Sequence, residues 1–421
     1  MFSKFQNKLM QILMPIANKI EQQKHLQAIK DGMIAIIPII IIGSFSLLPL
    51  ALANLLGSGA VYDFLTAHMS VFTYASMFSS DMLSIYAAMF IANALAKSYG
   101  IHNNQTAATA ILVHLILCGL SIDGGLSISY LGASGLFTSI ISAILTVEVT
   151  RIMREKKLYI RLPESVPTMV GESFSSLLPL VVNVIIAVVI ANVSLAFSGD
   201  VFPAFVMSIL APAITTMDTL PALLIVIFLT QFLWFFGLHG PSITSAVWAS
   251  FAIAYGAENI ANYAAGQPVE HIFTFGLFYA MLQVTGSGLT LGLVIMMMRS
   301  KSESFKAIGK VAIVPSLFGI NEPLIFGAPI ILNPYMFIPF VFGPLVITVT
   351  TYLAMTTGLV DMPIAEPPGF LPPGVGAFIM TLDWKAVVLV FVNLLIMAAI
   401  YYPFFKSMEA EELKKELGEN A

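Results

Sequence analysis

The chain has 421 residues, of which 58% are hydrophobic and only 10% are charged. Soluble domains carry about 25% charged residues, so this composition excludes a soluble globular protein and indicates a polytopic membrane protein. The net charge of −4 indicates no partner by itself, and the basic loops flank apolar segments instead of forming a nucleic-acid patch. The single cysteine, Cys118, lies in an apolar run and excludes an intrachain disulfide.

The N-terminal residues 1–30 place apolar side chains at helical spacing and lysines on the other face. This pattern predicts an amphipathic helix that lies on the membrane surface. The Pro-rich segment 161–174 is predicted to be a connector or surface helix. The segment 201–220 is predicted to be an interfacial helix or a half-span.

Ten apolar segments have about the length needed to cross a bilayer. They lie at about 33–56, 72–96, 105–122, 132–150, 176–197, 221–238, 242–256, 272–298, 336–357 and 386–404. The predicted fold class is therefore an all-α polytopic membrane protein with about ten transmembrane helices. Two membrane domains are expected, at 31–200 and 201–405, followed by a tail at 406–421.

Lysine and arginine are distributed unevenly among the predicted loops. The loops 57–70 and 123–131 have none, whereas 151–161 and 299–310 are rich in them. The positive-inside rule places the basic loops in the cytoplasm. Both termini are expected on the same cytoplasmic side.

Two apolar places are interrupted by glycine and proline. They are 235–241, which reads FFGLHGP, and 317–334, which reads LFGINEPLIFGAPIILNP. Irregular backbone at membrane depth is tolerated only where it is buried in protein or lines a cavity. Paired interruptions of this kind indicate the binding site of a transporter.

Glu322 is the strongest candidate for a functional side chain. A carboxylate at membrane depth costs about 2.5–3.5 kcal/mol on insertion scales, so it must face a polar cavity or a partner. Its neighbour Asn321 supplies a donor and an acceptor, and Pro323 leaves a backbone carbonyl without its helical donor. Such a site suits a sugar hydroxyl, which the carboxylate can bind and deprotonate. The alternative is a structural acid paired inside the bundle.

The other interrupted segment supplies His239, with Gly240 beside it and Trp234 five residues upstream. The imidazole can bond a sugar hydroxyl or stabilise a phosphoryl charge, and the indole can stack on a pyranose ring. The alternatives are a histidine satisfied by the backbone and a tryptophan in the core. Glu148 is expected to pair with Arg151 at the membrane rim.

Asp218 and Glu366 lie in or beside interrupted segments and are secondary candidates. The histidines have no partners at ligand spacing, so no metal site is predicted. The chain also has no phosphate-binding loop and no nucleotide-binding glycine motif. Neither a cofactor nor transport driven by ATP on this chain alone is therefore expected.

The motifs GINEPLIFGAPIILNP (319–334), FFGLHG (235–240) and YLGASGLF (130–137) resemble the membrane component, EIIC, of a bacterial sugar phosphotransferase system. The resemblance is to the lactose/cellobiose/chitobiose family and covers nearly the whole chain. It implies a homodimer in the plasma membrane, surrounded by lipid, with an N-terminal dimerisation domain. It also implies a C-terminal transport domain with two re-entrant hairpins.

The resemblance further implies a function. A disaccharide is taken up and phosphorylated at its 6-position by a phosphocysteine on a separate EIIB protein. Glu322 resembles the family's essential acid, and His239 its sugar-contacting histidine. Asn321, Trp234 and Gly240 resemble its site-lining residues. The segment around Phe370 departs from the family, because many relatives carry a tryptophan there, and this departure leaves the identity of the sugar open.

Two other functions fit the same residues. One is a proton-coupled secondary sugar transporter in which Glu322 carries the proton. The other is a sensory membrane protein that binds sugar without transferring a group. The release of an unmodified sugar would distinguish the first from group translocation.

Overall fold

The computed structural model describes residues 15, 19, 22–46, 48–101, 104–122, 125–163, 166–328 and 330–417. These residues are mostly helical and contain no β-strand beyond isolated bridges. Among them, six helices are long and apolar enough to cross a membrane, or seven when the bent pair α11 and α12 is counted as one span. The predicted all-helical membrane fold is therefore confirmed.

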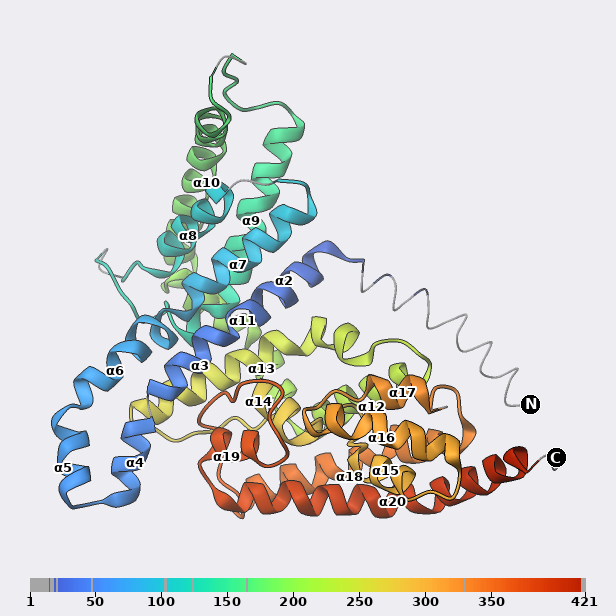
Figure 1. Cartoon of the computed structure of the whole chain (residues 1–421). Coiled ribbons are helices and arrows are strands. Elements are labelled where there is room, and N and C mark those ends of the chain that lie inside the picture. Colours follow the sequence, from blue (N-terminus) through green and yellow to red (C-terminus); the bar gives the residue numbers. More distant parts are fainter. Residues whose placement is uncertain are drawn as a thin grey trace. The chain divides into compact units, whose positions relative to one another are not determined.

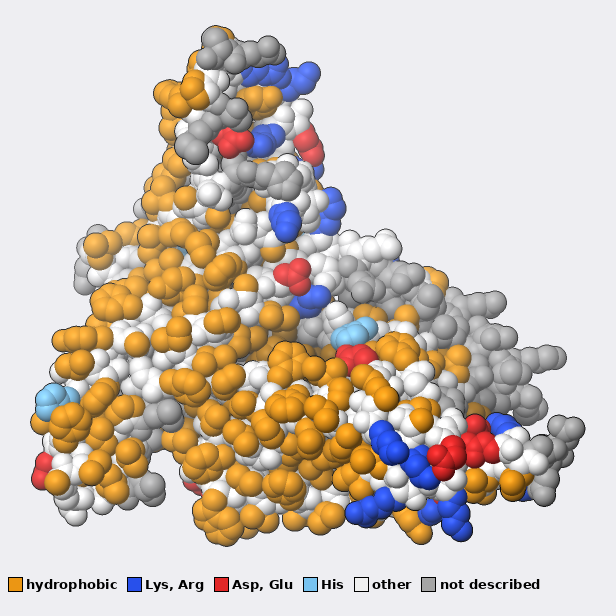
Figure 2. All heavy atoms as spheres, in the orientation of Figure 1, with side chains coloured by type: hydrophobic (Ala, Val, Ile, Leu, Met, Phe, Trp, Pro, Cys, Tyr) orange, Lys and Arg blue, Asp and Glu red, His pale blue; other side chains and the backbone are white. Residues whose placement is uncertain are grey.

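The surface of the protein carries many exposed apolar side chains. On the face shown in Figure 2, hydrophobic side chains cover most of the area and charged side chains gather in a few places. Ile185 and Leu395, for example, are 57% and 71% exposed. Apolar surface of this extent marks contact with a membrane or a partner.

The chain forms two compact units that are interleaved in sequence. The N-unit comprises Gln22–Thr215 and Ala249–Pro268. The C-unit comprises Thr216–Trp248 and Val269–Ala421.

The helices of the N-unit are labelled in Figure 1. In chain order they are α2 (Lys24–Ala35), α3 (Ile37–Ser46), α4 (Leu48–Leu56), α5 (Ala60–Ala67), α6 (Met69–Phe78), η1 (Ser80–Met82), α7 (Leu83–Ser98), α8 (Asn104–Cys118), η2 (Ala133–Gly135), α9 (Leu136–Glu155), α10 (Thr168–Ser198) and α11 (Phe202–Met217). Helix α11 ends just after the chain enters the C-unit.

Small residues let the N-unit helices approach closely, as is common in membrane bundles. A Cβ atom on Gly32 of α2 would lie only 2.5 Å from the Cα of Ile91 on α7. Farther along the chain, α8 and α10 share a core that contains Leu117 and Ala187, both at most 1% exposed. Apolar and small side chains thus determine which helices pack together.

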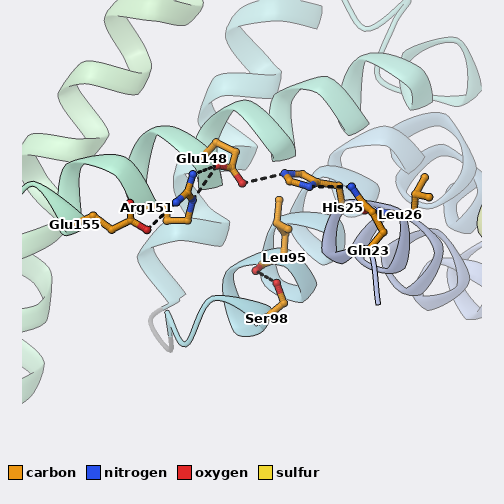
Figure 3. Close-up of polar contacts among 8 residues, drawn as sticks. All are labelled: Gln23, His25, Leu26, Leu95, Ser98, Glu148, Arg151 and Glu155. Carbon is orange, nitrogen blue, oxygen red and sulfur yellow. Dashed lines mark hydrogen bonds and ion pairs between the residues drawn. The ribbon is translucent and has the colours of Figure 1, made fainter. Parts of the chain in front are cut away.

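A charged network connects α2 to α9 (Figure 3). His25 Nε2 lies 2.9 Å from Glu148 Oε1, and Arg151 donates to Glu148 Oε2 at 2.7 Å. Arg151 also donates to Glu155 at 2.7 Å, and its guanidinium carbon lies 5.1 Å from the centre of the Tyr99 ring. The predicted ion pair between Glu148 and Arg151 is confirmed.

Two predicted boundaries in this unit are wrong. The first apolar span starts at Lys24 instead of about residue 33, because the Gln23 side chain accepts from Leu26 N–H at 2.6 Å and caps the helix there. The rest of the predicted surface helix, residues 1–14, 16–18, 20 and 21, lies outside the described residues. Helix α10 starts at Thr168 and so includes part of the predicted connector.

The C-unit has several short helical elements between its long helices, and they are labelled in Figure 1. In chain order they are α12 (Leu220–Phe235), α13 (Gly240–Ala264), α14 (Phe275–Leu277), η3 (Phe278–Leu282), α15 (Leu291–Met298), α16 (Glu303–Leu317), α17 (Glu322–Gly327), α18 (Pro334–Thr356), α19 (Val375–Thr381) and α20 (Trp384–Glu416). Helix α13 continues into the N-unit after Trp248.

The predicted continuous span at 272–298 is also wrong. After the π-helical turn η3, residues 283–290 are irregular, and the helix resumes only at α15. Gly286, Gly288 and Leu289 have φ angles of +86°, +86° and +48°, which a helix cannot contain. The run QVTGSGLT therefore breaks this apolar segment.

The two interruptions predicted from glycine and proline are confirmed. Helix α12 ends at Phe235, and α13 begins at Gly240. Helix α16 ends at Leu317, and only the six-residue α17 separates it from α18. The C-unit thus contains three breaks in apolar sequence.

Helix α20 extends beyond the predicted last span and includes most of the predicted tail, as far as Glu416. Its end holds the turn between α15 and α16. Glu409 Oε1 accepts from Ser300 Oγ at 2.5 Å and from Lys301 N–H at 3.0 Å. Glu416 accepts from Ser302 Oγ at 2.7 Å. These contacts fix the start of the helix that leads to the Glu322 segment.

We expect Glu409→Ala to lower the free energy of unfolding by about 1–3 kcal/mol, because it leaves the buried Ser300 hydroxyl without its acceptor. Thermal unfolding of the detergent-solubilised protein measures this loss. Glu412→Ala is the matched control, since the one polar contact of the Glu412 side chain among the described residues is a 3.7 Å pair with Lys415. Equal unfolding temperatures for the two variants would contradict the prediction.

Candidate functional site

The structure brings the two predicted interrupted segments together within the C-unit. Leu332 N–H donates to the Phe235 carbonyl at 3.0 Å, which joins the loop after α17 to the end of α12. The rings of Trp234 and Phe326 lie 6.1 Å apart at 67°. Trp234 therefore packs directly against the short helix that begins with Glu322.

His239 lies in the turn between α12 and α13, and its ring is 4.7 Å from that of Trp234. Ser242 N–H donates to His239 Nδ1 at 3.1 Å. Because Nδ1 is the acceptor, the proton of the neutral ring is on Nε2. The exposed imidazole thus has one nitrogen held by the backbone and presents an Nε2–H donor on its other edge.

Trp234 is 3% exposed, and its indole Nε1 is buried with no protein acceptor among the described residues. A buried indole N–H usually finds a hydrogen-bond partner. Trp234 combines an apolar ring packed on two neighbours with a donor available to a ligand. Because the ring is covered by its neighbours, this position fits a polar contact through the indole N–H.

Glu322 is the first residue of α17, and Pro323 follows it. Its Oε2 atom is buried and has no protein partner among the described residues. A structural acid paired inside the bundle would show such a partner. Glu322 and Phe326 are separated by one helical turn, so they lie on the same side of α17. The carboxylate is therefore on the side that also contacts Trp234.

Asn321 is 3% exposed, and the protein uses both of its amide hydrogens. Its Nδ2 donates to the Ser287 carbonyl at 2.7 Å and to Thr290 Oγ1 at 2.9 Å. These bonds hold the residue before Glu322 against the irregular segment 283–290. The side chain fixes the position of α17.

Gly240, the first residue of α13, is buried against α12. A Cβ atom at this position would lie only 1.9 Å from the Thr230 carbonyl oxygen. The absence of a side chain therefore allows the two helices to approach closely. This requirement accounts for glycine next to His239.

The two secondary candidates have structural partners. Asp218 Oδ2 lies 2.9 Å from His271 Nδ1, and Oδ1 accepts from the N–H groups of Ile272 and Phe273 at 3.2 and 2.8 Å. Glu366 is 2% exposed and accepts from the Gly276 backbone N–H. Both carboxylates thus hold the chain at the start of the broken segment 272–298.

Sequence reasoning missed the irregular segment 283–290 and two buried glutamines, Gln231 and Gln283. The sequence signal for this irregular segment was the run QVTGSGLT, in which two glycines and four polar residues interrupt an apolar stretch. Among the described residues, no group of three side chains is arranged to hold a metal ion. The site instead offers a carboxylate, an imidazole and an indole, which are hydrogen-bonding groups suited to a neutral polyhydroxyl ligand.

The fold and the site define an all-helical membrane protein with a polar site between interrupted helices. The family model of the phosphotransferase system EIIC component matches residues 30–344. The chain therefore belongs to this family, whose members are the sugar permease components of that system.

Individual relatives match along nearly the whole chain. The oligo-beta-mannoside-specific EIIC component of Bacillus subtilis (strain 168) is 32% identical over 97% of this chain and 95% of its own length. The lactose-specific EIICB component of Lacticaseibacillus casei is 31% identical over 97% of this chain and 73% of its own length. The solved structure of ChbC, the IIC component of the N,N'-diacetylchitobiose-specific system, matches with a TM-score of 0.88 and 28% identity, and the match covers 98% of this chain and 100% of ChbC.

Proposed function

We propose that this permease takes up a disaccharide and that the sugar is phosphorylated on its 6-hydroxyl by a separate EIIB protein during uptake. The observation that carries the proposal is the buried Glu322 Oε2, which has no protein partner among the described residues and lies on the side of α17 that faces Trp234. The relatives named for oligo-beta-mannoside, lactose and N,N'-diacetylchitobiose support a sugar of two or more rings.

The proposed step needs little covalent chemistry from this chain. The sugar 6-hydroxyl donates to Glu322 and accepts from His239 Nε2–H. Its oxygen attacks the phosphorus of the phosphocysteine, the S–P bond breaks as the O–P bond forms, and Glu322 takes the hydroxyl proton. The thiolate stays on EIIB. Positioning and charge stabilisation supply most of the acceleration in phosphoryl transfer.

Trp234 is proposed to donate its indole N–H to a sugar hydroxyl, because Nε1 has no protein acceptor among the described residues. Asn321 and Gly240, predicted as sugar contacts, act in this proposal by positioning Glu322 and His239, because their own close neighbours are protein groups. Phe370 has a φ of +60° and is 72% exposed. The resemblance implies that many family members carry a tryptophan near this position, so the preferred disaccharide is left open among cellobiose, chitobiose and lactose types.

The proposal extends to the arrangement in the membrane. The C-unit is the transport domain and contains two re-entrant hairpins. The whole chain crosses the membrane ten times. One hairpin is formed around α17, and the other is formed by the Pro-rich segment 361–378. The N-unit supplies the contacts of a homodimer and meets lipid. Both termini lie in the cytoplasm, where EIIB docks near the basic loop 299–310.

Vesicles test the proposed function directly. Right-side-out vesicles containing the permease are loaded with phosphorylated EIIB and given labelled cellobiose, chitobiose or lactose outside. We expect the internal label to be sugar 6-phosphate and the uptake to require the phosphorylated partner. Vesicles loaded with unphosphorylated EIIB are the control. Recovery of unmodified sugar, with uptake indifferent to EIIB and accompanied by a pH change, would establish the proton-coupled alternative.

A further inference from the structure

Two glutamines in the C-unit are buried without any protein hydrogen bond to their side chains. Gln231 on α12 is 0% exposed, and Gln283 at the end of η3 is 4% exposed. For both residues, Nε2 and Oε1 have no protein partner among the described residues. By contrast, the buried amide of Asn393 in the same unit is bonded at both atoms, because its Nδ2 donates to Thr351 Oγ1 at 2.9 Å and its Oδ1 accepts from Thr350 at 2.8 Å.

The energetic cost of such an arrangement is large. A buried donor or acceptor without a partner costs about 1–3 kcal/mol, and the great majority of buried polar atoms in proteins are bonded. Leucine at both positions would avoid this cost. The two glutamines therefore need hydrogen-bond partners from outside the protein, which ordered water or a bound ligand can supply.

Both glutamines lie on elements that form the site already described. Gln231 precedes Trp234 by three residues, so the two side chains lie on the same face of α12. Gln283 begins the irregular segment 283–290, which holds Asn321 through the Ser287 carbonyl. The carbonyl oxygen of Gln283 lies 4.0 Å from the position of a Cβ atom on Gly319, the first residue of the GINEP motif.

The chemistry of the two side chains specifies the class of ligand. A primary amide presents an acceptor oxygen and two N–H donors in one plane. This set matches a pair of neighbouring hydroxyl groups on a sugar ring, each of which both donates and accepts. Two uncharged amides suit a neutral ring and would not compensate the charge of an ion.

We infer that Gln231 and Gln283 bind ring hydroxyl groups of the transported sugar and determine which hydroxyl pattern is accepted. This inference rests on the proposed sugar-uptake function and assigns the two residues as specificity determinants. The third interruption of the C-unit then has a role, because it places Gln283 next to the Glu322 motif.

The experiment compares Gln231→Leu and Gln283→Leu with the wild type in the absence of EIIB. Binding of cellobiose, chitobiose and lactose to the detergent-solubilised permease is measured by calorimetry, and thermal unfolding is measured without sugar. We expect about tenfold weaker sugar binding for each variant and no decrease in the unfolding temperature. Loss of an unpartnered amide removes no protein hydrogen bond.

Asn393→Leu is the matched control. Asn393 is also 0% exposed in the C-unit, but it donates to Thr351 Oγ1 at 2.9 Å and accepts from Thr350 at 2.8 Å. Its replacement is expected to lower the unfolding temperature and to leave sugar affinity unchanged. The control is thus expected to behave as a purely structural amide, which is the opposite of the pattern expected for the two glutamines.

Monodeoxy analogues of the bound disaccharide identify the hydroxyl that each glutamine contacts. The analogue that lacks the hydroxyl contacted by a given glutamine should bind the wild type and that glutamine's variant with equal affinity. In this analogue the hydrogen bond between sugar and glutamine is already missing. If both glutamine variants bind the parent sugar with unchanged affinity, with or without a lower unfolding temperature, the inference about the glutamines is wrong. The proposed uptake function would not be affected by that result. A wild type that binds none of the three sugars would overturn the proposed function together with the inference about the glutamines.

Discussion

Replacement of Glu322 by glutamine is expected to reduce sugar phosphorylation from phosphorylated EIIB by about 10²–10⁴-fold. The amide keeps the size and an acceptor of the carboxylate, but it cannot take the proton of the attacking hydroxyl. Sugar affinity should change by less than about tenfold, because the remaining contacts of the site are retained. The Glu322→Gln change is therefore expected to slow the phosphoryl-transfer step much more than it weakens sugar binding.

Three measurements on one preparation test this expectation. They are the rate of sugar 6-phosphate formation at saturating sugar, the sugar affinity without EIIB, and the unfolding temperature. Because Glu322 Oε2 makes no protein hydrogen bond among the described residues, the unfolding temperature should not decrease. Phosphorylation at the wild-type rate would exclude Glu322 as the base.

His239→Ala provides the contrast. This change removes the Nε2–H donor next to Trp234, and sugar binding is expected to weaken about tenfold. A Glu322→Gln variant impaired in chemistry and a His239→Ala variant impaired in binding would separate the two roles. Wild-type transport by both variants would refute the site.

Replacement of Gly286 by alanine is expected to have the largest structural effect. The residue has a φ of +86°, which costs a residue with a Cβ about 1–2 kcal/mol. The added Cβ would lie 2.3 Å from Asn321 Cγ, and overpacking of a tight site typically costs about 1–3 kcal/mol more. Asn321 must then move from its two acceptors, and Glu322 moves with it.

We expect the Gly286→Ala protein to unfold at a lower temperature and to lose most of its phosphorylation activity. Gly358→Ala is the control, since Gly358 has a φ of +71° but nothing within 4 Å of its Cβ position. It isolates the cost of the backbone conformation. Asn321→Ser in the Gly286→Ala background shortens the obstructing side chain and should recover part of the stability. Equal effects of Gly286→Ala and Gly358→Ala would show that the contact with Asn321 is unimportant.

Several features of the fold were available from the sequence because they depend on local composition. Long apolar segments specify a membrane protein wherever they pack, and glycine and proline break helices through their own backbone chemistry. The breaks at 235–241 and 317–334 were predicted for this reason. The break at 283–290 was missed because glycine alone, without proline, is tolerated in many apolar helices.

The sequence by itself therefore determined the membrane class, the family motif and the candidate residues Glu322 and His239. The tertiary structure decided what surrounds them. It placed Trp234 against both His239 and α17, used the amide of Asn321 for positioning, and buried Gln231 and Gln283 without protein partners. Hydrogen-bond partners and close approaches depend on residues far apart in the chain, such as Gly286 and Asn321, and no local pattern specifies them.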